Sequence, residues 1–221
     1  WRGRRLEQIA AELVQPFGIA IELAGETGAP FTRFALQQGE TVFAAIERMC
    51  RYRGLVAWSA GDGVLRIGDP SSGQSIGRLA EGENVIFASR TITVSDRFSE
   101  YIVKGQATGS DARNGSAVAQ VRGEARDAAI TRYRPLLIVG EEQSDRASLG
   151  TRAEWEAAVR SGRSQPVQIT VPGWLTADGT PFAHGMRATC DVPSAGISGS
   201  LLIERLSFSR DAQGGTVTTF D

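Results

Sequence analysis

Apolar residues at the start of the chain follow helical spacing and then change to alternation. They recur every three or four positions from Leu6 to Leu13, which predicts an amphipathic helix over residues 4–15. Pro16 and Gly18 should end it, because proline cannot continue the hydrogen-bond ladder and glycine accepts a positive φ. The alternating residues 19–23 then predict a strand.

A second helix and a hairpin are predicted to follow. Thr41 is a suitable N-cap for a helix whose apolar face runs from Val42 to Cys50, and Gly54 should close it. Residues 55–58 and 64–67 flank a turn with the sequence Asp-Gly, which is a strong hairpin signal. Residues 1–69 should therefore form a small two-helix α/β module.

Residues 69–75 are rich in serine, glycine and proline, so a domain boundary is expected there. Beyond it the pattern predicts mostly short strands, with one helix near residues 145–161. The expected strands cover residues 78–80, 85–94, 98–106, 117–125, 133–139, 167–171, 187–192, 201–210 and 216–220, and residues 193–199 are expected to be a loop. The predicted fold class is therefore α+β, with the module at 1–69 followed by a β-rich, barrel-like domain at 70–221.

Two of these segments, residues 96–106 and 131–139, each begin with charged and aromatic residues and continue into apolar ones. Between them lies a polar stretch whose first part, residues 107–116, is expected to be mobile. We expect the charged entrances to hold the strands in register, within one subunit or against a neighbouring one. The candidate structural or interface residues are Asp96, Arg97, Phe98, Glu100, Tyr101, Arg132, Tyr133 and Arg134.

Composition narrows the classes of protein that are possible. The formal net charge is −1, so no overall field favours nucleic acid or an anionic membrane. No apolar run approaches the roughly 20 residues of a membrane span, and no signal peptide is expected. Cys50 and Cys190 lie far apart, and we expect two buried free thiols rather than a disulfide.

Motifs for catalysis or cofactor binding are missing from the sequence. The single histidine, His184, lies in a predicted loop without a nucleophile motif, and one histidine with two distant cysteines does not make a usual zinc set. Adjacent carboxylates such as Glu141 and Glu142 leave a glycosidase open, although loop carboxylates are usually solvated. We therefore predict no cofactor, no metal and no enzyme activity.

Several short segments resemble one known family in the same order. They are residues 5–10 and 16–18, residues 40–42, residues 82–84, residues 96–101 with 103–105, residues 131–135, and residues 173–174 with 178–179. Together they resemble the baseplate hub (tail protein) family of Mu-like contractile-tailed phages. Family members carry a β-barrel domain before the first helix of this chain, and the resemblance implies that this barrel is lacking here.

The resemblance implies a structural subunit of the central baseplate hub of a phage, prophage or tailocin tail. Such hubs are homotrimeric rings that join the tail tube to the spike, in virions assembled in the bacterial cytoplasm. It implies no specific nucleic-acid binding and no direct membrane span. A glycan-binding module, a hub-associated peptidoglycan hydrolase and a secretion-system hub remain as alternatives.

Overall fold

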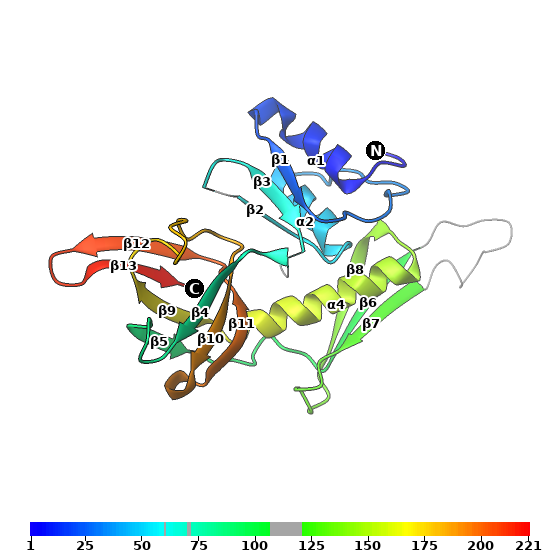
Figure 1. Cartoon of the computed structure of the whole chain (residues 1–221). Coiled ribbons are helices and arrows are strands. Elements are labelled where there is room, and N and C mark those ends of the chain that lie inside the picture. Colours follow the sequence, from blue (N-terminus) through cyan, green and yellow to red (C-terminus); the bar gives the residue numbers. More distant parts are fainter. Residues whose placement is uncertain (60, 70–71, 107–120) are drawn as a thin grey trace, which may run out of the picture.

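The computed structural model describes residues 1–59, 61–69, 72–106 and 121–221. Over these residues it has an α+β fold with three α-helices and four small sheets (Figure 1). The expected strand at 117–125 is described only from residue 121 onward. The expected mobile loop at 107–116 lies outside the described residues.

The first 69 residues form the predicted elements around a three-stranded sheet. The strand order is β1–β3–β2, with β1 parallel and β2 antiparallel to β3. Thr41 caps α2 as expected, because its Oγ1 accepts a hydrogen bond from the N–H of Ala44 at 3.2 Å. Gly18 ends the first helical segment in the left-handed region at φ 65°. The elements are α1 (Leu6–Val14), the 3₁₀ helix η1 (Gln15–Phe17), β1 (Ile21–Ala24), α2 (Val42–Arg51), β2 (Val56–Ser59) and β3 (Leu65–Gly68).

A second sheet of three strands lies against this module. Strand β6 (Glu100–Gln106) is central, with β7 (Val121–Arg126) antiparallel on one side and β8 (Pro135–Gln143) parallel on the other. Helix α4 (Arg146–Arg163) begins at Asp145, which accepts a hydrogen bond from the N–H of Ser148 at 2.8 Å. Figure 1 shows α4 lying along one face of this sheet.

The remaining strands form two further sheets. One has the order β11–β10–β4, and the other has the order β12–β13–β9–β5. Their strands are β4 (Ser75–Ala80), β5 (Phe87–Arg90), β9 (Val167–Pro172), β10 (Arg187–Val192), β11 (Ile197–Leu202), β12 (Leu206–Asp211) and β13 (Gly215–Phe220). The hydrogen bonds between the described strands close no barrel. Where a barrel-like domain was expected, the described strands form separate open sheets.

Two hydrophobic cores divide the chain in a way that the linker at 69–75 does not predict. The first core joins α1, α2 and β3 to Tyr101 and Val103 of β6 and to Leu149 and Ala153 of α4. The second core lies between the two C-terminal sheets and contains residues from β4, β9, β10, β11 and β13. The boundary at residue 69 stays a prediction, because the segment from β6 to α4 shares a core with residues 1–69.

The expected loop at 193–199 is wrong in its second half. A short 3₁₀ helix, η3 (Pro193–Ala195), ends at Gly196, which adopts φ 65° and turns the chain back into β11. Ile197 is buried and starts this strand, whereas most of the following small polar residues are exposed. The expected strands at 85–94 and 201–210 are also too long, since β5 spans only Phe87–Arg90 and β12 begins at Leu206.

Both cysteines are free and buried, as the sequence predicts, with exposed fractions of 1% for Cys50 and 3% for Cys190. Burial raises the pKa of Cys50 to about 12 and also raises the pKa of Cys190. We therefore expect little reaction with a thiol reagent in native buffer and two reactive thiols after denaturation. Rapid titration of either thiol in the folded protein would contradict this prediction.

Candidate functional site

The two segments singled out by their charged entrances start side by side. In the parallel pairing of β6 with β8, Glu100 lies opposite Pro135, so residues 96–100 and 132–135 meet at one end of the sheet. The backbone N–H of Ser99 donates to the carbonyl of Arg134 at 2.9 Å, which extends the ladder by one step. The candidate site consists of these two entrances and the C-terminal end of α4.

Arg97 makes the strongest interaction of this end. Its Nε and Nη2 each donate to a carboxylate oxygen of Asp127 at 2.8 Å, giving a bidentate ion pair. The two side chains are 8% and 9% exposed. A weaker contact of 3.5 Å joins Nη1 of Arg97 to Oγ of Ser164, the C-cap of α4. Arg97 therefore connects the entrance of β6, the end of β7 and the end of α4.

Asp127 belongs to this site, and the sequence analysis did not single it out. It follows β7 in the polar stretch 107–129, where its carboxylate also accepts the N–H of Ala129 at 3.1 Å. The hydrogen bonds from Arg97 hold its pKa below the ordinary value, and the Asp127 side chain raises the pKa of Arg97. An aspartate that accepts the N–H two residues on is typical of a turn, and this local pattern was the available signal.

Phe98 lies between two guanidinium groups from other elements. The Arg134 guanidinium is 4.6 Å from its ring centroid, and that of Arg160 on α4 is 5.5 Å away. Both arginines also donate to backbone carbonyls of the segment before β6: Arg134 to Val94 and Ser95, and Arg160 to Asp96. Cation–π contacts of this kind add about 0.5–1 kcal/mol each at exposed sites.

Tyr101 supports Phe98 from inside the first core. The two rings meet edge to face with centroids 6.0 Å apart. The buried hydroxyl of Tyr101 accepts the N–H of Phe98 at 3.1 Å, which satisfies a polar group in an otherwise apolar core. The conformation of the β6 entrance is therefore fixed from within the fold.

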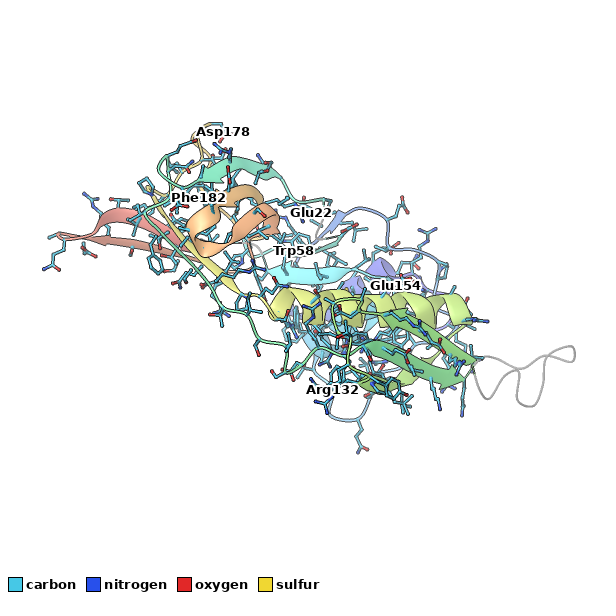
Figure 2. The ribbon with its side chains drawn as sticks, turned by 90° about the horizontal axis from the view of Figure 1, so that it is seen from below. Glu22, Trp58, Arg132, Glu154, Asp178 and Phe182 are labelled. Carbon is cyan, nitrogen blue, oxygen red and sulfur yellow. The ribbon has the colours of Figure 1, made fainter. Side chains whose placement is uncertain are left out.

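Of the remaining candidates, Asp96, Arg132 and Tyr133 are exposed and Glu100 is half-buried. Glu100 pairs with Arg126 at 3.1 Å, but the Arg126 side chain is 81% exposed. Asp96 is exposed, and its carbonyl rather than its carboxylate accepts from Arg160. Arg132 and Tyr133 extend away from the sheet, and Figure 2 shows Arg132 at the periphery of the molecule. Within the described residues Arg132 has no hydrogen-bond or ion-pair partner, so a role in register remains a prediction for it.

A cleft of about 310 Å³ lies beside this end of the sheet, between α2, α4 and the segment before β6. Its walls carry both signs of charge, and Arg160 on one wall is already paired with Glu156 at 2.9 Å. It is lined by Glu47, Arg51, Thr93, Asp96, Trp155, Glu156, Val159, Arg160, Arg163 and Ser164. No nucleophile and base face one another among these residues.

The single histidine, the possible metal ligands and the helices show no further site in the described part of the chain. Nδ1 of His184 lies 2.8 Å from the carbonyl oxygen of Glu204, in an exposed loop of the C-terminal half. The described part of the chain holds no cluster of three potential metal ligands. Within that same part, no helix is both long and apolar enough to cross a membrane. The arrangement around Arg97 and Phe98 is suited to fixing elements relative to one another.

Two buried ion pairs predict acid sensitivity. Besides the Arg97–Asp127 pair, Nε and Nη2 of Arg48 on α2 each donate to a carboxylate oxygen of Glu40 at 2.7 Å. The hydrogen bonds from the two arginines lower the pKa values of Asp127 and Glu40. A carboxylate whose pKa is lower in the folded state stabilises the fold fully above its unfolded pKa of about 4, and that stabilisation is lost as the pH falls through the folded value. Urea unfolding at pH 7 and between pH 4 and 2.5 should show the free energy of unfolding falling steeply.

The matched variant is Asp127→Asn, which removes the titrating carboxylate of one of these pairs. It should lower stability at pH 7 and reduce the loss of stability below pH 4. An unchanged acid profile in this variant would mean that the ion pair between Arg97 and Asp127 contributes nothing to the pH dependence.

Comparisons with known proteins give a consistent result. A family model described as "Baseplate hub protein gp44-like, second domain" matches residues 1–69. The baseplate hub protein gp44 of Escherichia phage Mu is 31% identical over 226 residues, which cover 99% of this chain and 59% of the Mu protein. This chain therefore spans less than two thirds of that relative.

Solved structures are similar along the whole chain. The 43 kDa tail protein of prophage MuSo2 from Shewanella oneidensis superposes with a TM-score of 0.81 at 28% identity, covering 100% of this chain and 65% of that protein. The tail protein from Neisseria meningitidis MC58 superposes with a TM-score of 0.79 at 23% identity, covering 99% and 66%. The second likeness concerns the fold alone.

Proposed function

We propose that this chain, which belongs to the family of Mu-like phage baseplate hub and tail proteins, is a structural subunit of the central baseplate hub of a contractile tail. The observation that carries the proposal is the 31% identity to the Mu hub protein, which extends along 99% of this chain. A phage baseplate role follows from that relationship.

In the proposed hub, three copies form a ring that connects the tail tube on one side to the spike on the other. A closed threefold rotation uses two different patches on each subunit, and every contact is repeated three times. The two sheets around the second core would supply a barrel-like part of this ring. The protein would be made in the bacterial cytoplasm and would reside in the baseplate of the virion.

The site around Arg97 supports a mechanical role rather than a chemical one. Arg97, Arg134 and Arg160 each join segments that are distant in the sequence, through carboxylate, carbonyl or aromatic contacts. A subunit that carries load between tube and spike needs elements that keep their relative positions. We propose that the protein has no catalytic function.

Localisation in purified tail particles tests the proposal directly. Antibody labelling under the electron microscope should place the protein at the baseplate end, and cross-linking of the pure 23.6 kDa chain should recover trimers at three times that mass. Absence from intact particles would reject the hub assignment. Turnover of peptidoglycan by the pure protein, abolished by a single polar substitution, would instead favour a hydrolase.

A further inference from the structure

Strand β8 forms one edge of the β7–β6–β8 sheet and exposes apolar side chains there. Leu137 is 56% exposed and Val139 is 75% exposed. Side chains alternate between the two faces of a strand, so these two lie opposite Leu136 and Ile138, which pack against the first core. The outer face of β8 therefore carries an uncovered apolar pair.

The unpaired backbone groups of this edge belong to the same two residues. The carbonyl of Arg134 accepts a hydrogen bond from the N–H of Ser99, so the backbone polar groups of Arg134 point toward β6. In a parallel pair, successive residues turn their N–H and C=O groups to alternate sides. It follows that Leu136 and Ile138 also bond to β6, whereas Leu137 and Val139 direct their N–H and C=O groups to the free edge.

This edge is protected at both ends but not between them. Pro135 has no N–H to offer at the start of the strand. Near the other end, the N–H of Glu141 donates to the hydroxyl of Tyr52 at 2.8 Å, and the register with β6 shifts after Val139. Proline, charges and bulges are the usual means of protecting an edge strand, and residues 136–139, here called the open segment, have none of them.

Two cations near the open segment lack partners within the described chain, whereas the carboxylate of Glu141, two residues beyond Val139 on β8, already accepts a hydrogen bond from the Tyr52 hydroxyl at 3.0 Å. Lys104 lies directly opposite Val139 in the β6–β8 register, and Arg132 precedes the strand. No ion pair or hydrogen bond engages either side chain among the described residues. The carboxylate of Glu100 on β6 is already bound to Arg126. A binding partner with acidic residues would complement both free cations.

We propose that the open segment binds an extended segment of another protein, which adds a fourth strand beside β8. The backbone of the added strand would pair with the free N–H and C=O groups of Leu137 and Val139. Every second side chain of that strand would be apolar and would cover the side chains of Leu137 and Val139. Carboxylates toward its ends would lie near Arg132 and Lys104. Strand addition of this kind combines main-chain hydrogen bonds for affinity with side-chain contacts for specificity. In the proposed hub, this partner would be another tail component, but the argument needs only the geometry of the edge.

Synthetic peptides provide the probe. The first has nine residues, the length of β8, with valine and threonine alternating between terminal aspartates. The second has lysines in place of the aspartates, and the third has N-methylated backbone amides that cannot join a ladder. With the whole chain, the first peptide should slow amide hydrogen exchange at Leu137 and Val139. The second should bind about tenfold more weakly, and the third should not bind.

Two charge substitutions on exposed edge strands make the test specific. Val139→Lys should weaken binding of the aspartate peptide by about tenfold or more, because it places a charge inside the apolar contact. Phe208→Lys is the matched control, because Phe208 is a 45% exposed apolar residue on β12, at the edge of a different sheet. This control should leave binding unchanged.

Three outcomes would overturn the inference. The first is equal binding by the wild type and Val139→Lys, and the second is equal binding by the normal and N-methylated peptides. The third is self-association in light scattering that Val139→Lys abolishes, because the occupant would then be a second copy of this chain. None of these bears on whether the protein resides in the baseplate, so the hub proposal is tested separately.

Discussion

Replacing Gly123 with alanine should detach α4 from its sheet and cost at least about 3 kcal/mol of unfolding free energy. A Cβ on Gly123 would lie 2.1 Å from the carbonyl carbon of Leu149 and 2.2 Å from the nitrogen of Gly150. These are backbone atoms of a helix, so no side-chain rotation relieves the clash and the helix itself has to move. Leu149, which is fully buried in the first core, would move with it.

Gly150 supplies the matched control within the same helix. An added Cβ there meets nothing within 4 Å, and alanine is favoured over glycine in a helix interior by about 0.5–1 kcal/mol. Gly150→Ala should therefore raise the urea midpoint, whereas Gly123→Ala should lower it sharply. If both variants unfold within about 0.5 kcal/mol of the wild type, the close contact between β7 and α4 is not a feature of the folded protein.

Arg97→Ala has the second-largest expected effect, a loss of about 3 kcal/mol, because it leaves the buried carboxylate of Asp127 without its partner. Arg126→Ala is the control, since that side chain is 81% exposed in its pair with Glu100 and should contribute roughly 0–1 kcal/mol. Urea unfolding of both variants near pH 7 gives the comparison.

A double-mutant cycle shows whether the pair itself is responsible. Asp127→Ala alone should also destabilise, and the double variant should lose clearly less than the sum of the two single losses. Additive losses would mean that the two side chains stabilise the fold independently. Equal effects of Arg97→Ala and Arg126→Ala would mean that the Arg97 pair is solvated like the surface pair.

Local signals in the sequence predicted most of the secondary structure. Helical spacing located α1 and α2, and the Asp-Gly turn located the β2–β3 hairpin. Capping chemistry gave the start of α2, since Thr41 accepts a hydrogen bond from the N–H three residues on. These features depend on residues close together in the chain, where spacing and side-chain chemistry act directly.

The features that escaped prediction depend on contacts between distant residues. The first part of strand β11 holds two serines and a glycine after Ile197, and its place in the sheet comes from pairing with β10 rather than from its own pattern. Apolar spacing shows that α4 has a buried face but not that this face belongs to the first core. In the sequence Asp127 does not differ from other loop carboxylates, because its partner Arg97 comes within 2.8 Å only in the folded chain.

The glycines around Leu149 are a similar case. Besides Gly123, an added Cβ on Gly105 or Gly140 would come within 3.2 Å of the Leu149 side chain. Three glycines from three strands thus make room for one leucine of α4. The sequence holds 26 glycines in 221 residues, and turns are the usual explanation for so many.

The division between the two cores has a consequence for synthesis on the ribosome. Strands β4 and β5 emerge early, yet their ladder partners are β10 and β9, which follow only after the whole segment from β6 to α4. During translation, residues 1–69 and that segment can assemble around the first core while β4 and β5 remain unpaired. Completion of the second core is therefore expected to follow assembly of the first core, and nascent chains arrested before β9 would display two strands with unsatisfied edges, the form most exposed to aggregation.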